Sequence, residues 1–568
     1  MPQRRTKAVA AATVSLIAAF SAAPALATST TGPSTDTDPY VVPVAPSVST
    51  TSILTVGDTV DRLGGGEPYR MVGIPDGLGV NRGGSAMRVY MNHELPFTRG
   101  SVRRHGQTGA FVSQLDIDRR SLRVYTGFDL IDPGVLYWDY PSETYSDAPS
   151  TAGENPRDAG VVTAPGNPTA TPPVLPTIAR DQFLAQEAAF GRFCSGDLTD
   201  EGQLLNEETG RGYDGRVYFA NEEVGDEGRA FGVTEDGTAQ QLQRLGLFSW
   251  ENTLAAHNQS DTTLVVGNED DAAGQLRAYV GRKGRRGDAF DKAGLTNGAN
   301  FVARISDGEA ESAGQIRTDA QFRAQVGKGE EANVTLAEVD WDQSGAAQNR
   351  ESAADGLSLN RIEDGAFDPS NPNDYYFLTT EGGKGSPEST GLTGRDGGGV
   401  WRMRFDDIER PELGGTLELL LDGSETPLLN KPDNMDIDRH GNLLIQEDPG
   451  RNVSIARIVA YRIDDGARGV VAEFDRELFA PATAGGEDAE LTVDEESSGI
   501  VDTEKTLGRG TFLFDAQVHP PAKVTANPDG TFPPSVYNNG KTIAADLVED
   551  GQLLKLKVRD FDRVYDGE

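Results

Sequence analysis

The sequence predicts an all-β fold, specifically a six-bladed β-propeller with irregular and partly helical insertions. Two observations lead to this prediction. Short apolar runs that end in a carboxylate or a histidine recur along the chain, and turns rich in Gly and Asp separate them. In a propeller, each such run would be a buried strand that delivers its last side chains to a common axis. Spacing alone also allows five or seven blades. The runs are Arg88–Glu94, Arg216–Glu223, Thr263–Asp270, Asp374–Glu381, Asn442–Pro449 and Thr511–His519.

The first 27 residues have the organisation of a secretory signal peptide. Arg4, Arg5 and Lys7 precede the apolar stretch Ala8–Phe20, and Ala25-Leu26-Ala27 supplies small residues for cleavage. The arginine pair is compatible with the twin-arginine export route, but ordinary signal peptides also carry two arginines. The apolar stretch is too short to span a membrane.

The rest of the chain is predicted to form one propeller. Residues 28–52 are rich in Ser, Thr, Pro and Asp, which is typical of a flexible lead-in. The β pattern then runs over residues 53–568, with insertions expected near 141–190 and 305–355. No later segment of the sequence is apolar enough to span a membrane.

The charge balance excludes one class of partner. The chain has 52 Lys and Arg against 89 Asp and Glu, a formal net charge of −37. A nucleic-acid-binding protein needs a basic surface, so no nucleic-acid partner is expected. The excess of acids suits a secreted protein or one that collects divalent cations, although an acidic, solvated surface explains most of these residues equally well. The single cysteine, Cys194, excludes an intramolecular disulfide.

Carboxylates at the ends of the predicted strands are the main functional candidates. If the strands converge on one axis, cations are needed to hold these like charges together. Carboxylate oxygens suit Ca²⁺, and also ferric iron or Mn²⁺. The alternative is that acids at strand ends mark solvated turns, although the same placement recurs several times. The set is Glu94, Glu222, Glu223, Glu269, Asp270, Glu363, Glu447 and Asp448.

Familiar hydrolase motifs are absent from the sequence. It contains no HExxH, GxSxG, P-loop or Rossmann fingerprint, and its five histidines are scattered. Cys194 stands before Ser195-Gly196 in a turn, where it is either a soft metal ligand or a small buried apolar residue. Asp436–Gly441 (DIDRHG) is either the start of a calcium loop or a β-turn between two strands.

Several of these motifs, taken in order, resemble the PhoX-type bacterial alkaline phosphatases and the related DUF839 proteins. The resemblance spans roughly residues 55–520. It implies a six-bladed propeller with an iron–calcium cluster on its axis, twin-arginine export and hydrolysis of phosphate monoesters. The motifs are Asn92–Glu94, Cys194–Gly196, Glu222-Glu223, Tyr279–Lys283 with Ala293–Gly298, Asn360-Arg361 with Glu363, and Pro432–Asn434 with Gln446–Gly450.

The resemblance also implies roles for single residues. Cys194 would ligate iron, and Arg361 would grip the substrate phosphate, since a planar guanidinium matches two oxygens at once. Lys283 would assist, and His93 is a further catalytic candidate. Acidic ligands of iron or calcium would be Glu222, Glu223, Glu269 and Glu363, and the strand-end pattern adds Glu94, Asp270 and Glu447.

One region departs from the family pattern. In the family, the cysteine motif continues through a Thr-Pro-Trp segment to a nearby Cys-Glu-Glu. Here Asp197–Arg216 is longer and lacks tryptophan, and Asn221 stands where the second cysteine would be. The chain therefore resembles a divergent member of the family.

The expected function is that of a secreted phosphomonoesterase that uses Ca²⁺ and Fe³⁺ to hydrolyse small phosphate esters. A calcium-dependent propeller hydrolase, such as a phytase or lactonase, would use the same acids without Cys194. A third possibility is a non-catalytic propeller that binds calcium and a partner.

Overall fold

The computed structural model describes residues 27–139, 143–147, 188–306, 315–382, 397–451, 454–480 and 489–567. The predicted signal peptide, apart from residue 27, lies outside these residues, as does most of the insertion expected near 141–190. Within the described ranges, no helix is both long enough and apolar enough to cross a membrane.

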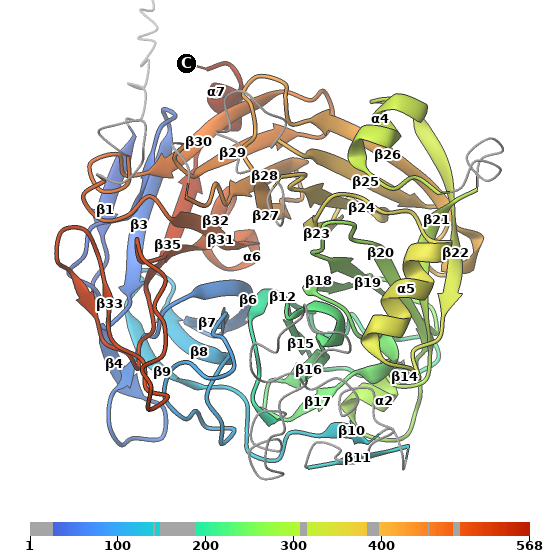
Figure 1. Cartoon of the computed structure of the whole chain (residues 1–568), viewed down its shortest axis with the longest axis horizontal. Helices are drawn as coiled ribbons and strands as arrows, with labels where there is room; N and C mark the ends of the chain where they lie inside the picture. Colours follow the sequence, from blue (N-terminus) through green and yellow to red (C-terminus); the bar gives the residue numbers. More distant parts are fainter. Residues whose placement is uncertain are drawn as a thin grey trace, which may run out of the picture.

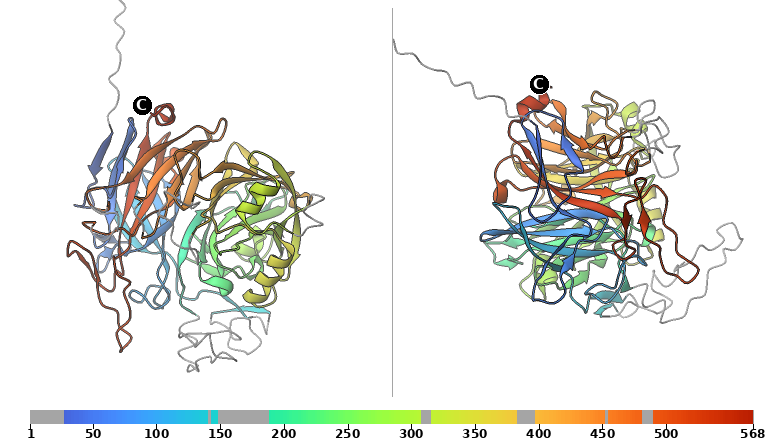
Figure 2. Two further views of the ribbon diagram at one scale, coloured as in Figure 1. Left: turned by 45° about the horizontal axis from the view of Figure 1, so that its top comes forward. Right: turned by 90° about the vertical axis from the view of Figure 1, so that its left-hand side faces the viewer.

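The protein is built almost entirely of β-strands, as the sequence predicts. Its larger sheets stand side by side around a common axis, in a propeller-like arrangement (Figure 1). In both further views, tilted and from the side, the blue N-terminal strands lie beside red C-terminal strands (Figure 2). Four of these sheets have four to six strands, and a fifth has nine.

Two of the sheets contain the strands from β4 to β17, apart from four short strands. One has the order β5-β4-β9-β8-β7-β6 and the next has the order β12-β15-β16-β17. Their bounds are β4 (Thr59–Arg62), β5 (Tyr69–Arg70), β6 (Pro75–Gly83), β7 (Ala86–His93), β8 (Phe111–Asp118), β9 (Val124–Asp129), β12 (Phe193–Leu198), β15 (Val217–Glu222), β16 (Ala230–Thr234) and β17 (Ala239–Gln241).

The nine-stranded sheet follows, with the order β18-β19-β20-β21-β22-β26-β25-β24-β23. Strand β22 joins two antiparallel runs of four strands, because it pairs with both β21 and β26. The bounds are β18 (Trp250–Ala255), β19 (Thr262–Glu269), β20 (Leu276–Arg282), β21 (Ala299–Ile305), β22 (Glu331–Val339), β23 (Ile362–Asp368), β24 (Asn371–Thr379), β25 (Gly399–Phe405) and β26 (Gly415–Asp422).

The last two sheets combine strands from both ends of the chain. Their orders are β2-β30-β29-β28-β27 and β1-β3-β35-β32-β31. The bounds are β1 (Thr28–Thr31), β2 (Val41–Pro43), β3 (Val48–Thr55), β27 (Pro432–Ile437), β28 (Asn442–Glu447), β29 (Arg457–Arg462), β30 (Arg468–Phe474), β31 (Glu495–Asp502), β32 (Thr511–Val518) and β35 (Asp550–Val558).

In each of the four smaller sheets, and in each half of the nine-stranded sheet, one end strand faces the middle of the molecule. Around the axis, β6 contacts β12, β12 contacts β18, β18 contacts β23, β23 contacts β27, β27 contacts β31, and β31 contacts β6. These six innermost strands therefore form a closed ring, visible at the centre of Figure 1. The strand next to each of them is packed on both faces, and every residue of β15 and β28 is buried.

Residues 28–52 differ from the predicted flexible lead-in. This segment contributes β1, β2 and most of β3, and the blue N-terminal strands lie beside red C-terminal strands in Figure 1. Its Ser and Thr side chains, which are typical of linkers, here form a ladder: the Thr30 and Thr51 hydroxyls are 2.9 Å apart, and those of Ser29 and Thr50 are 3.2 Å apart. Strand β3 is buried against β35, which explains why a polar sequence is ordered.

Short helices decorate the sheets. Helices α4 (Asp319–Gln325) and α5 (Gly345–Asp355) both lie in the stretch that was expected to hold helical pieces, and α5 contacts β21 and β22. Side chains cap them at their N-termini, since Thr318 accepts from Gln321 N and Ser344 accepts from Ala347 N.

Candidate metal centre

The innermost strands and their neighbours form six antiparallel hairpins with a shared register. In each hairpin, the first residue of the innermost strand pairs with the last residue of the next strand. The paired residues are Pro75 and His93, Phe193 and Glu222, Trp250 and Glu269, Ile362 and Thr379, Pro432 and Glu447, and Glu495 and Val518.

A bulge follows this first pair in five of the six hairpins. The register shifts between Pro75 and Leu78, for example, and between Phe193 and Gly196. A bulge leaves its extra residue unpaired and re-aims that side chain. In these five hairpins the second residue of the innermost strand is left unpaired, whereas Glu496 of the sixth pairs with Gln517.

Two sets of equivalent positions thus surround the axis. The first set is the second residue of each innermost strand, and the second set is the residue that follows each neighbouring strand. The first set is Asp76, Cys194, Glu251, Glu363, Asp433 and Glu496, and the second is Glu94, Glu223, Asp270, Thr380, Asp448 and His519.

Ten of these twelve side chains form four groups, each with three possible metal ligands. Within a group, the ligand atoms all lie within 4.8 Å of one another. Consecutive groups share Cys194 and then Glu251, so the first three form a continuous arc. Among the described residues the groups are Asp76–Glu94–Cys194, Cys194–Glu223–Glu251, Glu251–Asp270–Glu363 and Asp433–Asp448–Glu496.

Burial and mutual repulsion dominate the electrostatics of this arc. Burial, with Glu94 adding to it, raises the pKa of Asp76 well above its usual range. Burial and then Glu363 raise the pKa of Glu251 in the same way. Burial raises the pKa of Glu496 to about 8, and Asp448 contributes. Carboxylates that repel each other in this way need cations to ionise together.

The thiol of Cys194 belongs to the same arrangement. It lies 3.4 Å from Glu251 Oε1 and 3.6 Å from Asp76 Oδ2. Burial, followed by Asp76 and Glu251, raises its pKa well above the usual value. Cys194 is therefore not a packing residue among apolar side chains. Its donor atom lies between two carboxylates.

This donor set fits bound cations. Most ligand atoms are carboxylate oxygens, which suit Ca²⁺, and the single thiol adds one soft ligand that suits iron. All members of the four groups are buried except Asp448, which is half-buried, and burial followed by neighbouring carboxylates raises the pKa values of Asp76 and Glu251. The residues therefore match the requirements of a multi-metal centre.

Three of the predicted ligands point elsewhere and pair with arginines. Adjacent residues at the end of a strand face opposite sides, so only one acid of each pair can face the axis. Glu222, Glu269 and Glu447 end their strands and lie outside the four groups. Their partners are Arg229, Arg277 and Arg457, at 2.6 Å, 3.2 Å and 2.6 Å.

Arg361 lies at the edge of the arc. Its Nε and Nη2 donate to the two oxygens of Asp270, at 2.8 Å and 3.0 Å, and Nη2 also lies 3.1 Å from Glu363 Oε1. Both acids raise its pKa against the opposing effect of burial. The predicted phosphate clamp is thus within reach of the centre, and it is paired with two of its acids.

Lys283 and His93 are in different surroundings from those that a catalytic role would require. Lys283 follows β20 at the end that pairs with Thr262, whereas Asp270 follows the opposite end of β19, roughly 25–30 Å away at strand spacing. Its Nζ donates to Asn258 O at 2.9 Å. The His93 ring stacks on Phe111, and its Nδ1 and Nε2 lie 3.1 Å from Gly73 O and 2.6 Å from Ser113 Oγ.

The sequence reasoning missed the acids at the starts of the innermost strands. Asp76, Glu251, Asp433 and Glu496 were not among the candidates. A signal for them exists in the sequence, because each acid comes one residue into a strand and is followed closely by Gly, Asn or Ser: Asp76-Gly77, Glu251-Asn252, Asp433-Asn434 and Glu496-Ser497.

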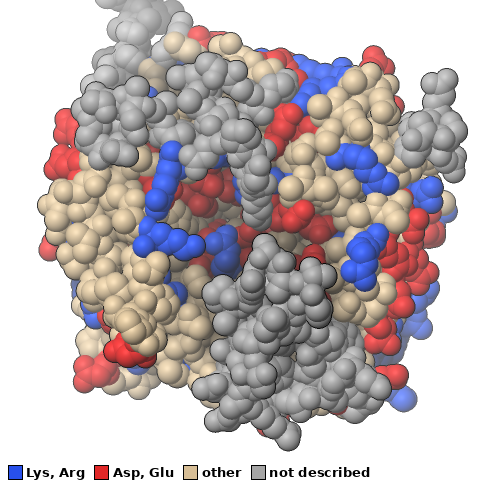
Figure 3. Space-filling model, viewed as in Figure 1, with Lys and Arg blue, Asp and Glu red and all other residues tan. Residues whose placement is uncertain are grey.

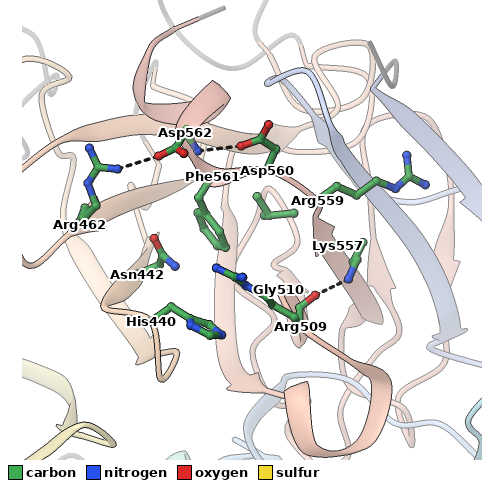
Figure 4. Close-up of a pocket in the computed structure, with 11 residues that line it drawn as sticks. His440, Asn442, Arg462, Arg509, Gly510, Lys557, Arg559, Asp560, Phe561 and Asp562 are labelled. Carbon is green, nitrogen blue, oxygen red and sulfur yellow. Dashed lines mark hydrogen bonds and ion pairs between the residues drawn. The ribbon is translucent and has the colours of Figure 1, made fainter. Parts of the chain in front are cut away.

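The two ends of the blade strands differ: acidic side chains gather at one end (Figure 3), and a hollow lies at the other. In the space-filling view, acidic side chains gather around the middle of the molecule, with basic ones beside them (Figure 3). A hollow of about 580 Å³ lies at the other end, lined by His440 and Asn442 at the start of β28 and by Arg509 and Lys557 (Figure 4). Asp436–Gly441, for which the sequence left a calcium loop or a β-turn open, comprises the end of β27 and the turn to β28, where Asp438 accepts from His440 N.

The fold and the site together define an all-β, propeller-like protein with a candidate metal centre on its axis. A family model described as alkaline phosphatase PhoX matches residues 213–493, about half of the chain. The chain belongs to the PhoX family, as the sequence motifs predict.

One solved structure supports this fold. Pseudomonas fluorescens PhoX, in complex with the transition-state analogue vanadate, is 12% identical, with a TM-score of 0.58 over 95% of this chain and 97% of that one. The BP39L lectin from Burkholderia pseudomallei is 11% identical, with a TM-score of 0.30 over 83% of this chain and 99% of that one. No curated protein sequence matches.

Proposed function

We propose that this protein is a metal-dependent phosphomonoesterase of the alkaline phosphatase type, acting on small phosphate esters. The observation that carries the proposal is the arc of buried ligand groups on the axis, in which carboxylates and one thiol lie within 4.8 Å of one another. Membership of the PhoX family supports the same activity.

The proposed architecture is a single six-bladed propeller over residues 53–568, preceded by a signal peptide at residues 1–27. Support for six blades comes from the nine-stranded sheet, which contains two innermost strands, β18 and β23, and therefore counts as two blades joined by β22. The segments near 141–190 and 305–355 would be insertions between blade strands. A signal peptide would place the enzyme outside the cytoplasm.

The proposed metal ions are Ca²⁺ and Fe³⁺. Ferric iron would be held where the thiol is available, in the two groups that share Cys194. Calcium would be held by the all-carboxylate groups, because it takes six to eight oxygen ligands. The proposed ligands are Asp76, Glu94, Cys194, Glu223, Glu251, Asp270, Glu363, Asp433, Asp448 and Glu496. Glu222, Glu269 and Glu447 would instead anchor the hairpin ends through their arginines.

The reaction follows from this arrangement. When bound, the cations would supply charge for the phosphate and Lewis acidity for the attacking water. Arg361 would bind the phosphate oxygens through its planar fork, next to the carboxylates that hold the cations. No side-chain nucleophile is needed, because the chemistry depends on positioning and on charge.

The alternatives differ in their use of Cys194. A calcium-dependent phytase or lactonase, or a non-catalytic calcium-binding propeller, would need the carboxylates alone. The position of the thiol inside two of the four groups favours the iron-containing phosphatase.

Elemental analysis and activity on the same preparation test the proposal. Purified protein is expected to contain calcium and iron and to hydrolyse p-nitrophenyl phosphate. Removal of both metals with a chelator should abolish hydrolysis and lower Tm, because metal bound only to the native state stabilises it. Metal-loaded protein that hydrolyses no phosphate ester would overturn the phosphatase proposal, and calcium without iron would favour the alternatives.

A further inference from the structure

Three basic residues occupy the same position in the fold. Arg192, Arg361 and Lys431 each come directly before an innermost strand, β12, β23 and β27 respectively. All three have a positive φ, of 40°, 60° and 48°. A residue other than glycine rarely adopts this conformation, and such outliers concentrate at functional sites.

Arg192 differs from the other two in what it contacts. Its guanidinium lies 2.5 Å from Glu94 Oε1, and its Nε donates to Glu223 Oε2 at 3.1 Å. These acids belong to different ligand groups, and the two groups meet at Cys194. Arg192 therefore spans the part of the arc that contains the thiol.

The exposure of Arg192 is unusual for an arginine that contacts two buried acids. Its side chain is 46% exposed, whereas those of Glu94 and Glu223 are 6% and 5% exposed. By comparison, Arg361 is 14% exposed, and Arg229, which only holds Glu222, is 1% exposed. Of these three arginines, Arg192 is therefore the most accessible to a molecule that approaches from solvent.

We infer that Arg192 is a second phosphate-binding side chain, facing the substrate together with Arg361. This inference rests on the proposed phosphatase function. In the metal-free protein, Arg192 supplies the counter-charge for Glu94 and Glu223. Once these carboxylates are ligands of cations, the guanidinium is available to the phosphate oxygens, which it matches through two parallel hydrogen bonds.

Arg192→Gln and Arg192→Lys test this role, with Arg404→Ala as the matched control. Arg404 in β25 donates to both carboxylate oxygens of Asp374, each at 2.6 Å. Asp374 lies near the start of β24, at the opposite end from the candidate metal centre. Binding of inorganic phosphate to each metal-loaded variant would be measured by calorimetry. Tm would be measured with and without metal, together with kcat and KM for p-nitrophenyl phosphate.

For Arg192→Gln we expect the Kd for inorganic phosphate to rise about ten-fold or more, since a charge-assisted bond to an anion is lost. Arg192→Lys should recover part of this affinity because it keeps the charge without the fork. Tm of metal-free Arg192→Gln should fall, since Glu94 and Glu223 lose their counter-charge. Metal content at saturation should match wild type, and Arg404→Ala should bind phosphate like wild type.

Phosphate affinity is the deciding measurement. Metal-loaded Arg192→Gln that binds phosphate as wild type does, with only a lower metal-free Tm, would limit Arg192 to a structural role and overturn the inference. Wild-type protein that binds phosphate through Arg192 but hydrolyses no ester would support the inference while ending the phosphatase proposal. Wild-type protein that is metal-loaded and neither binds phosphate nor hydrolyses an ester would overturn both.

Discussion

Glu222 and Arg229 form an ion pair that is closed to solvent, with side chains 0% and 1% exposed. Arg229 Nε and Nη2 donate to the two carboxylate oxygens at 2.6 Å and 2.7 Å. The next residue, Glu223, faces the axis and belongs to a ligand group with Cys194 and Glu251. Two adjacent glutamates thus have separate tasks, one structural and one in the centre.

This separation predicts opposite effects for the same chemical change. Glu222→Gln should lower the free energy of unfolding by about 3–5 kcal/mol, because Arg229 keeps a buried charge without its partner. Glu223→Gln should instead reduce the metal content with a smaller effect on the metal-free protein. Elemental analysis and denaturant titration of both variants check this. Equal metal loss in both would mean that Glu222 also ligates.

Replacement of the thiol should change which metal is bound. In Cys194→Ser the soft ligand is lost while all carboxylates remain, so iron content should fall and calcium content should stay near that of wild type. Elemental analysis of the two proteins, purified in parallel, measures this. Unchanged iron in Cys194→Ser would show that carboxylates alone hold it.

Removal of the predicted phosphate clamp should affect catalysis and leave metal content unchanged. Arg361→Ala is expected to reduce kcat/KM for p-nitrophenyl phosphate by about ten- to a hundred-fold, since it loses a charge-assisted interaction of about 1.5–3 kcal/mol. Arg361→Lys should recover part of the loss. If iron or calcium is lost together with activity, Arg361 shapes the centre through Asp270 and Glu363 and does not bind substrate.

Lys283 should be dispensable for catalysis. Because it lies at the far end of its strand, Lys283→Met should keep kcat/KM within about two-fold of wild type. Burial lowers the pKa of Lys283 to about 8, below the value near 10.4 of an exposed lysine. The native state then binds fewer protons than the unfolded state between these values, so wild type should gain stability relative to Lys283→Met as pH rises from about 8 to 10. A large loss of activity would restore its predicted catalytic role.

Sequence patterns alone pointed to some of the side chains in the candidate metal centre. Apolar runs followed by acids predicted the all-β class, and four of the acids that they singled out, Glu94, Glu223, Asp270 and Glu363, lie in the buried ligand groups. They could not say which of two adjacent acids faces the axis, because that depends on the strand register. Glu222 and Glu223 are equivalent in the sequence, and only the pairing of Phe193 with Glu222 separates them.

The remaining misses have a similar physical cause. Asp76 and Glu251 reach the centre because a bulge turns them, and a bulge is a property of two paired strands, not of one segment. Strand β3 was missed because its Ser and Thr residues are typical of linkers, whereas their burial depends on β35, some 500 residues away in the chain.

The pairing of β3 with β35 also has a consequence for the order of assembly. The sheet that contains Glu496 needs strands from both ends of the chain, so it cannot be completed until Asp550–Val558 has been synthesised. Contact between β31 and β6, which brings the sheets of Glu496 and Asp76 together, depends on that sheet. A nascent chain would therefore expose unpaired strand edges until late in synthesis. The centre would acquire its full set of ligands in the last step of folding, so metal uptake would report that the chain has closed on itself.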